Sequence, residues 1–439
     1  MNPEMWQFPK LSRRFRCLRS YSMSVEPIKR YTLVPFVNSP FSTSDSSPAG
    51  NVSSSGPAVL APYDVSEIPI EKRRLENVLL VSNEVMHYRV PVYNYFNKRF
   101  REYGFEFSVI TNRLQKQNQR PLEFRLREVP FDFLAYKRAI TAEQPAMVIL
   151  FLHLKDWIVW PLIHWMKLRR IPFAFWTKGG NWDVKDSKLR YQMFNYVHGM
   201  SDALILYADA CRNFIKPRFH GKTFVANNTI NFNDFPAVHE SEAEIKHEFG
   251  IPFQKTVIFM GRMGAGNGRK RVDHLIEMFR ILDRQDIGLV LVGSGLSEEL
   301  KARMNPRNTV YLGEVHDPQD RQISKLCKMA DVCVIPGHVG LGLNQAFFWG
   351  LPVITEEGDH PPEIVYLKPG RNGVVVPPND TASLRAQLLH LLDNDQLRSE
   401  FSRHAREDIL LDASIEGMFV GFKSCVDFLT ARRNPGAAS

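Results

Sequence analysis

The sequence is poor in cysteine, in uninterrupted apolar runs and in metal-binding motifs, and each shortage excludes a class of protein. Its 439 residues include five cysteines, with no Cys-x-x-Cys pair and no His/Cys cluster of metal-ligand spacing, which excludes a disulfide scaffold and a zinc domain. The single Asp-x-Asp, Asp393-Asn394-Asp395, lies in a polar stretch and predicts a solvated turn. No apolar run reaches the roughly 20 residues that a membrane-spanning helix needs. We therefore expect reduced thiols, no metal site and a cytoplasmic protein.

Acidic residues are outnumbered by basic ones, which gives a formal net charge of +9. This balance predicts anionic partners, such as nucleotide phosphates, an acidic membrane surface or nucleic acid. The basic residues are spread along the chain and form no single run, so nucleic acid is not an expected partner. Hydrophobic residues at 44% and charged residues at 23% are ordinary for a globular protein with room for two or three domains.

The segment Met147–Trp176 comes nearest to a membrane segment, but charged residues interrupt it. It contains four tryptophans next to a basic cluster, which permits two interpretations. One is a surface in contact with lipid headgroups at the inner face of a membrane. The other, which we favour, is a core strand followed by a core helix and a second core strand.

Residues 1–70 are expected to be disordered and of low complexity. Within them, Ser39–Ala61 is rich in Ser, Pro and Gly and nearly uncharged, a composition that cannot bury a core. We assign this segment no function.

An alternation of apolar runs and amphipathic stretches begins at Asn77 and predicts a parallel, doubly wound sheet in residues 71–240. The helix expected first is Val92–Phe100. The expected strands are Val78–Val81, Phe105–Ile110, Met147–Leu152, Pro172–Trp176, Ala203–Leu206 and Thr223–Val225. The loops that follow these strands should carry binding residues.

The alternation restarts after Asp234–Phe253, a polar stretch that reads as a linker, and predicts a second domain over residues 241–412. An amphipathic helix is expected at Arg271–Leu282. The expected strands are Lys255–Met260, Leu289–Val292, Val310–Leu312, Val332–Ile335 and Pro352–Thr355. The chain after Ala382 reads as helical. Residues 413–439 are expected to form a helix that returns to the first domain, and a tail.

A glycine-rich turn, Gly337–Gly342, joins the strand Val332–Ile335 to a helix expected at Asn344–Trp349. Free N–H groups and the helix dipole at such a junction favour an anion. The helix is followed by Gly350, Pro352 and another strand, a succession far more specific than one glycine-rich loop.

This segment resembles the nucleotide-binding segment of GT-B glycosyltransferases of glycosyltransferase family 4. Gly340, Ala346 and the Gly350-Leu351-Pro352-Val353-Ile354 run match the family pattern in register. The resemblance implies an α/β protein of the GT-B fold, with two Rossmann-like doubly wound parallel-sheet domains facing a cleft. The two glutamates of the family's Glu-x7-Glu motif are replaced here by Gly337 and Gln345.

Arg262 and Lys270 carry the chemistry that the resemblance implies. Gly261-Arg262 ends a strand and Lys270 begins a helix, as in the family, where these cations hold the two phosphates of a nucleotide sugar. Fixed cations stabilise a departing diphosphate most in the transition state, so no metal is required. Arg269 and Arg271 are alternatives to Lys270. The intervening Gly264–Gly268 also imitates a dinucleotide fingerprint, which makes NAD binding a weak alternative.

Further donor-binding residues follow from the same resemblance. They are Gly261, Gly293, Val315, Gly337, His338, Gly340, Leu341, Gln345 and Glu363. The amide of Gln345 can still accept a ribose hydrogen bond. Glu363 has the alternative interpretation of a carboxylate that caps backbone N–H groups. His338 and His360 are expected at the cleft, where either would bond the sugar or phosphate or, as an open alternative, face solvent from a loop.

The first domain supplies a third candidate catalytic residue. Lys178 stands where the family often has a histidine that contacts the transferred sugar, although a surface lysine is an open alternative. His153 and Lys155 follow the preceding strand, and Tyr88 and Arg89 are expected to face the acceptor.

The leading hypothesis is a retaining, metal-independent hexosyltransferase with no cofactor besides a nucleoside-diphosphate sugar. Its acceptor would be a carbohydrate or a lipid-linked saccharide, in polysaccharide or glycolipid biosynthesis. One alternative is a catalytically weak relative that binds nucleotide sugar as a regulatory partner. Another is a sugar-nucleotide epimerase of the same fold.

Overall fold

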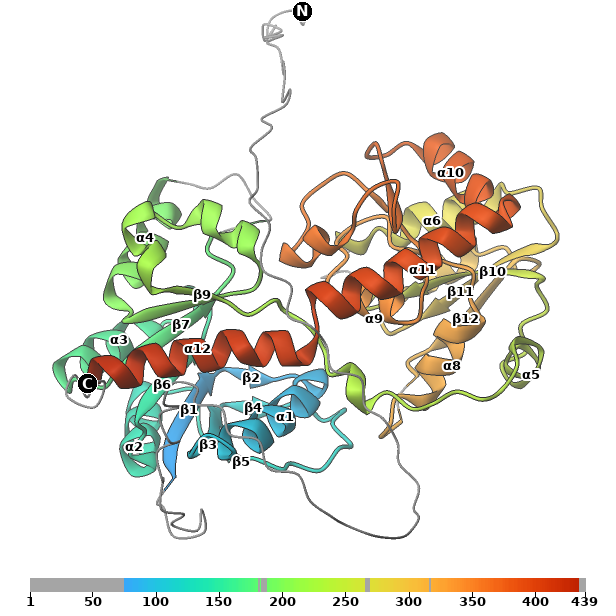
Figure 1. Cartoon of the computed structure of the whole chain (residues 1–439). Helices are drawn as coiled ribbons and strands as arrows, with labels where there is room; N and C mark the ends of the chain where they lie inside the picture. Colours follow the sequence, from blue (N-terminus) through green and yellow to red (C-terminus); the bar gives the residue numbers. More distant parts are fainter. Residues whose placement is uncertain (1–74, 181, 183–187, 265–268, 316, 434–439) are drawn as a thin grey trace, which may run out of the picture. The chain divides into compact units, whose positions relative to one another are not determined.

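The computed structural model describes residues 75–180, 182, 188–264, 269–315 and 317–433. The predicted disordered segment 1–70 and most of the loop Gly264–Gly268 therefore lie outside the described residues. Two parallel sheets organise the described part of the chain, each with its own hydrophobic core (Figure 1). This confirms the prediction of two doubly wound α/β domains.

The first sheet has seven strands in the order β5-β3-β1-β6-β7-β8-β9, paired in parallel throughout. Its central strands are continuous buried apolar runs, as expected where helices cover both faces. The strands are β1 (Glu76–Ser82), β3 (Phe105–Thr111), β5 (Arg125–Glu128), β6 (Met147–Phe151), β7 (Phe173–Thr177), β8 (Ala203–Leu206) and β9 (Thr223–Val225). The helices between them are α1 (Val90–Arg101), α2 (Phe133–Glu143), α3 (Val159–Leu168) and α4 (Lys188–Met200). Short strands β2 (Glu84–Val85) and β4 (Arg113–Leu114) form a separate pair.

The second sheet has six parallel strands in the order β12-β11-β10-β13-β14-β15. They are β10 (Lys255–Met260), β11 (Ile287–Val292), β12 (Thr309–Gly313), β13 (Val332–Val334), β14 (Val353–Glu356) and β15 (Gly373–Val376). The helices are α5 (Glu242–Glu248), α6 (Val272–Arg280), α7 (Glu298–Arg303), α8 (Arg321–Met329), α9 (Leu341–Phe348), α10 (Thr381–Asp393) and α11 (Asp395–Asp412). Connecting 3-10 turns include η2 (His87–Arg89), η3 (Asp209–Phe214) and η7 (Pro362–Tyr366).

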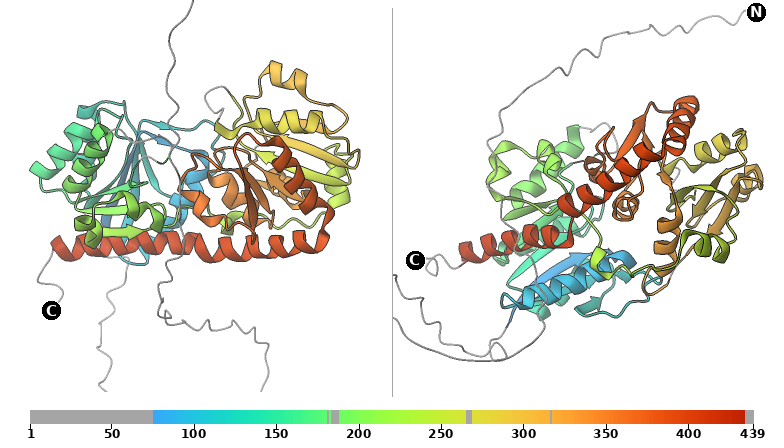
Figure 2. Two further views of the ribbon diagram at one scale, coloured as in Figure 1. Left: turned by 90° about the horizontal axis from the view of Figure 1, so that it is seen from above. Right: turned by 45° about the vertical axis from the view of Figure 1, so that its right-hand side comes forward.

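The last helix, α12 (Ile415–Arg433), packs on the first core although it follows the second sheet in sequence. It lies along β8 and β9 and beside α1 (Figure 1). Phe422 is fully buried and contacts Phe96 and Trp176, with ring centroids 4.7 and 5.0 Å away. Figure 2 shows α11 and α12 as two long consecutive helices.

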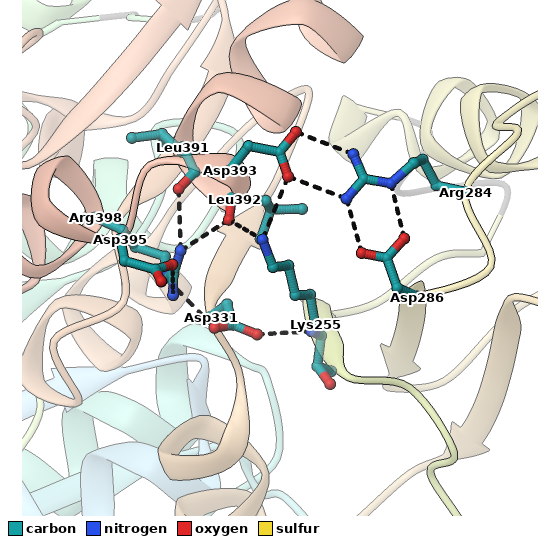
Figure 3. Close-up of polar contacts among 10 residues, drawn as sticks. Lys255, Arg284, Asp286, Asp331, Leu391, Leu392, Asp393, Asp395 and Arg398 are labelled. Carbon is teal, nitrogen blue, oxygen red and sulfur yellow. Dashed lines mark hydrogen bonds and ion pairs between the residues drawn. The ribbon is translucent and has the colours of Figure 1, made fainter.

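Two sequence interpretations need correction. The predicted linker Asp234–Phe253 contains helix α5, which begins with a capping box between Ser241 and Glu244. Asp393 is more than a solvated turn, because its carboxylate pairs with Arg284 and Lys255 (Figure 3).

The tryptophan-rich segment forms β6, α3 and β7, as favoured. Trp176 is buried, whereas Trp157 is 54% exposed. Among the described cysteines, Cys211, Cys327, Cys333 and Cys425 are buried free thiols. Within the described part of the chain, no helix has both the length and the apolar character required to cross a membrane.

Candidate functional site

The carboxyl ends of β10, β11 and β12 are joined by backbone hydrogen bonds. Gly261 donates to the carbonyl of Val292 at 2.9 Å, and Gly293 donates to that of Gly313 at 2.7 Å. A Cβ on Gly293, whose φ is +132°, would lie 2.0 Å from the carbonyl oxygen of Gly261, so only glycine lets these strand ends approach. Val315 follows two residues after β12 and is half-buried. Three expected donor residues therefore share the edge at which parallel sheets bind ligands.

The side chain of Lys270 crosses this edge. A Cβ on Gly261 would lie 2.7 Å from Cε of Lys270, and the Lys270 ammonium donates to the carbonyl oxygens of His338 and Val339, each at 3.1 Å. Removal from water lowers the pKa of Lys270 to about 8, although nearby Cys333 and Glu363 oppose the shift. An ammonium has three N–H donors, and these two bonds leave one for a ligand.

Helix α9 begins beside Lys270, three residues before the predicted start. Its N-cap, Gly340, has φ +61°, and the first helical residue is Leu341. A Cβ on Gly342 would lie 3.7 Å from the carbonyl oxygen of Met260, so the first turn of α9 lies next to the end of β10. The free N–H groups at the start of α9 and the Lys270 ammonium therefore lie close together. This arrangement favours a bound anion.

Gly337 cannot be replaced by a glutamate without moving backbone. Its N–H donates to the carbonyl of Lys270 at 3.0 Å, and that of His338 donates to Arg269 at 2.8 Å. A Cβ on Gly337 would lie 1.7 Å from the carbonyl oxygen of Arg269. Backbone hydrogen bonds thus join the loop of Gly337 to the loop of Arg269 at this position.

Gln345 is half-buried on α9, and its side chain makes no hydrogen bond to the described residues. It therefore remains available to a ligand. Arg262 is exposed and likewise forms no ion pair or hydrogen bond within the described part of the chain. Both observations are compatible with the expected roles, which stay predictions.

Arg271, expected as an alternative to Lys270, has a structural role. Its guanidinium pairs with the buried carboxylate of Glu356, with Nη1 2.7 Å from Oε2, and donates to Asn379 at 2.6 Å. His274 lies 3.0 Å from the other oxygen of Glu356. This network ties the start of α6 to the end of β14, so Arg271 is not free to bind phosphate. His360 is also engaged, because its Nε2 bonds with the Glu356 carbonyl at 2.7 Å, and burial lowers the pKa of His360.

Glu363 lies in η7 and is 4% exposed. One carboxylate oxygen accepts a hydrogen bond from the side-chain amide of Asn228, so the alternative of backbone capping is wrong for this oxygen. The amide oxygen of Asn228 in turn accepts from Nη2 of Arg89 at 2.7 Å. Arg89 is 4% exposed and stacks over Trp176, with its guanidinium carbon 4.9 Å from the ring centroid. The expectation that Arg89 faces an acceptor is therefore wrong, while Tyr88 remains half-buried beside it.

Two candidate residues of the first domain, Lys178 and His153, lie just after strands β7 and β6. The ammonium of Lys178 lies 6.0 Å from the ring centroid of Tyr207. Burial raises the pKa of the Cys211 thiol, and smaller effects come from Glu363, which raises this pKa, and from Lys178, which lowers it. Lys178 and Glu363 therefore both lie within electrostatic range of Cys211. His153 follows β6, and its backbone N–H donates to the carboxylate of Asp156 at 2.8 Å. Desolvation lowers the pKa of His153 although Asp156 acts against it.

The sequence interpretation missed Asn228 and Asn344. The backbone carbonyl of Asn228 accepts from the side-chain amide of Asn344 at 3.1 Å and from the Tyr366 hydroxyl at 3.3 Å. The signal was present in the residue types, because a buried asparagine must find hydrogen-bond partners, but the partners are remote in sequence.

Metal ligands are not gathered at this site. Within the described residues, no group of three or more His, Cys, Asp or Glu side chains is arranged to hold an ion.

The family comparison concerns the second sheet. Residues 254–394 match the family model described as "Glycosyl transferases group 1". The match runs from β10 to the end of α10 and includes every candidate donor residue.

Curated relatives match over part of their length. A phosphatidyl-myo-inositol mannosyltransferase of Mycobacterium leprae is 30% identical over 155 residues, which are 34% of this chain and 40% of that protein. The chain spans less than half the length of the curated relatives it matches.

Solved structures match over most of the described chain. HepE of Anabaena, solved with UDP, has a TM-score of 0.63 at 13% identity, covering 80% of this chain and 99% of that one. WaaG, titled a glycosyltransferase involved in lipopolysaccharide biosynthesis, has a TM-score of 0.58 at 17% identity, covering 80% and 99%. At these identities the likeness concerns the fold. Together with the two parallel sheets, it establishes that the chain has the GT-B fold.

Proposed function

We propose that this protein is a retaining glycosyltransferase of family 4. It moves a hexose from a nucleoside-diphosphate sugar to a carbohydrate or lipid-linked acceptor in polysaccharide or glycolipid biosynthesis. The observation that carries the proposal is the position of Lys270, whose ammonium lies between Gly261 and the start of α9. The glycosyltransferase model matched by residues 254–394 supports it.

In the proposed reaction the bond between the anomeric carbon and the terminal phosphate oxygen breaks. The acceptor hydroxyl forms the new glycosidic bond on the same face of the sugar and passes its proton to the departing diphosphate. The diphosphate gains negative charge in this step, so cations placed beforehand stabilise the transition state more than the ground state. Lys270 and Arg262 supply these charges, and the N–H groups at the start of α9 add to them.

The donor extends along the edge of the second sheet. The base and ribose lie toward Gly293 and Val315, and Gln345 accepts a ribose hydroxyl. Lys178 contacts the sugar or its phosphate from the first sheet, with His153 and Tyr88 on the acceptor side. We propose no metal and no cofactor other than the donor, because the two cations already provide the positive charge that the leaving group needs.

We also propose a cytoplasmic protein in peripheral contact with an acidic membrane surface. The support is the net charge of +9 and the exposed Trp157 two residues from Lys155. Flotation with anionic and neutral vesicles tests it. Binding to anionic vesicles that Trp157→Ala weakens is expected, and equal behaviour with both vesicles contradicts it.

A second candidate function is supported by one observation. The place of the family's first glutamate is closed to any side chain by the backbone of Arg269. A protein without that carboxylate could bind nucleotide sugar and regulate a partner without turnover. Both functions use the same binding residues, so catalysis alone separates them.

The experiment is a thermal-shift panel of nucleoside-diphosphate sugars followed by product analysis. A donor present at a hundredfold excess over its Kd stabilises the fold by about 2.7 kcal/mol. Transfer or slow hydrolysis of that donor supports the enzyme, and binding without turnover supports the regulatory relative. An isomerised donor recovered without acceptor would indicate an epimerase. Stabilisation by no member of the panel would contradict all three.

A further inference from the structure

Two hydrogen-bond acceptors lie buried and unused on either side of Asn228. Oε2 of Glu363 and Oδ1 of Asn344 have no hydrogen-bond partner in the described part of the chain, and their residues are 4% and 0% exposed. Among the described residues, Glu363 contributes the one buried carboxylate oxygen without a hydrogen bond. Leaving such groups unpaired costs about 1–3 kcal/mol each, so a folded protein rarely retains them without a use.

The orientation of both side chains is fixed by neighbours. Asn228 donates to the other oxygen of Glu363 and, through its carbonyl, accepts from the amide nitrogen of Asn344 at 3.1 Å. Because these contacts use a donor of Asn344, its free atom is the acceptor oxygen. The two free acceptors match a ligand that presents hydrogen-bond donors, and hydroxyl groups are such donors.

Charge and position relate Glu363 to the diphosphate site. Its carboxylate raises the pKa of the Lys270 ammonium, and it also acts on Tyr207 beside Lys178. In the second sheet, β13 and then β14 lie on one side of β10, and β11 and β12 lie on the other side. Strand β14 leads into η7, which contains Glu363. If base and ribose lie toward β11 and β12, Glu363 is on the opposite side of the phosphates, where the sugar extends.

We propose that Glu363, together with Asn344, binds hydroxyl groups of the transferred sugar and replaces the carboxylate that Gly337 cannot supply. Arg89 is a positioning residue for this contact, because it holds Asn228, and Asn228 holds Glu363. The inference rests on the proposed function, since it assumes a nucleotide sugar at Lys270.

The test compares a diphosphate with its sugar nucleotide, using UDP with UDP-glucose and GDP with GDP-mannose as probes. Calorimetry gives the ratio of their affinities for the wild type, Glu363→Gln and the matched control Glu357→Gln, an exposed carboxylate near the end of β14. Glu363→Gln should lower the ratio of sugar-nucleotide to diphosphate affinity about tenfold or more, the range for a hydrogen bond to a charged group. Glu357→Gln should change neither affinity.

The role of Arg89 is tested by a double-mutant cycle. Arg89→Met should lower the ratio of sugar-nucleotide to diphosphate affinity in the wild type but change it little in Glu363→Gln. A merely structural Arg89 would weaken the diphosphate equally in both backgrounds, which would overturn its positioning role. Far-UV circular dichroism verifies that each variant is folded.

Deoxy analogues of the bound sugar nucleotide provide a second measurement that does not depend on mutant stability. The wild type should reject at least one of them, because buried acceptors without a hydroxyl are left unpaired, and Glu363→Gln should lose that discrimination. Equal loss of diphosphate and sugar nucleotide in Glu363→Gln, or no loss in either, would overturn the proposal. Failure of the wild type to bind any of the four probes would instead overturn the proposed function.

Discussion

Arg271 and Glu356 form an ion pair whose carboxylate side chain is 2% exposed and whose guanidinium side chain is 25% exposed. The pair fastens the first residue before α6 to the last residue of β14, and so joins two loops of the candidate site. The role of the pair is structural, because the remaining contacts of the two side chains are also within the protein. Arg271 donates to Asn379, and Glu356 contacts His274 and accepts from the backbone N–H of Asn379.

Removal of the Arg271 guanidinium should destabilise the protein. Arg271→Ala leaves the buried carboxylate of Glu356 without its ion-pair partner, a change that costs about 3 kcal/mol or more in buried pairs. Urea unfolding followed by circular dichroism measures the free energy of unfolding. The matched control is Arg280→Ala, which breaks the exposed pair with Glu277, with side chains 52% and 35% exposed, and should cost at most about 1 kcal/mol. Equal effects of both variants would contradict the account.

Diphosphate affinity should fall as the pH rises above about 8. Lys270 has a pKa lowered to about 8 by removal from water, so its ammonium is lost in the free protein well below the usual 10.5. Between about pH 8 and pH 10.5, Lys270 is protonated to a greater extent in the unfolded chain than in the folded protein. Its contribution to the free energy of unfolding therefore increases with pH in this range. Calorimetric titration of the diphosphate from pH 7 to 10 is the measurement. Lys270→Arg retains its charge and should show a flatter profile. Identical profiles would show that Lys270 does not titrate at the binding site.

A side chain introduced at position 337 should destabilise the candidate site. Gly337→Ala already places a Cβ 1.7 Å from the carbonyl oxygen of Arg269, so the loops must separate, and Gly337→Glu should act likewise. Both variants are expected to lower the thermal midpoint by several degrees and to weaken donor binding. Gly358→Ala is the control, because its Cβ would meet no atom within 4 Å. Tighter donor binding by Gly337→Glu would contradict this interpretation.

Much of the fold could be predicted because buried parallel strands are local apolar runs. Ala203–Leu206, Thr223–Val225 and Lys255–Met260 have the predicted bounds. Strand β5 escaped prediction because its sequence, Arg-Leu-Arg-Glu, is polar and largely exposed at a sheet edge, where pairing alone defines the strand.

The candidate site was only partly predictable. Residues at strand ends, such as Gly261 and Gly293, could be placed because topology brings parallel strand ends together. The contacts of Arg89 and Glu363 with Asn228 could not, since they join residues 139 and 135 positions apart through side chains alone. No periodicity or local motif encodes such a contact.

The most direct test of the account compares a nucleoside diphosphate with its monophosphate. If Lys270 binds the second phosphate, the wild type should prefer the diphosphate at least about tenfold, as a charge-assisted hydrogen bond permits, and Lys270→Met should lose most of that preference. A preference that is unchanged in Lys270→Met, measured on folded protein, would contradict the central claim.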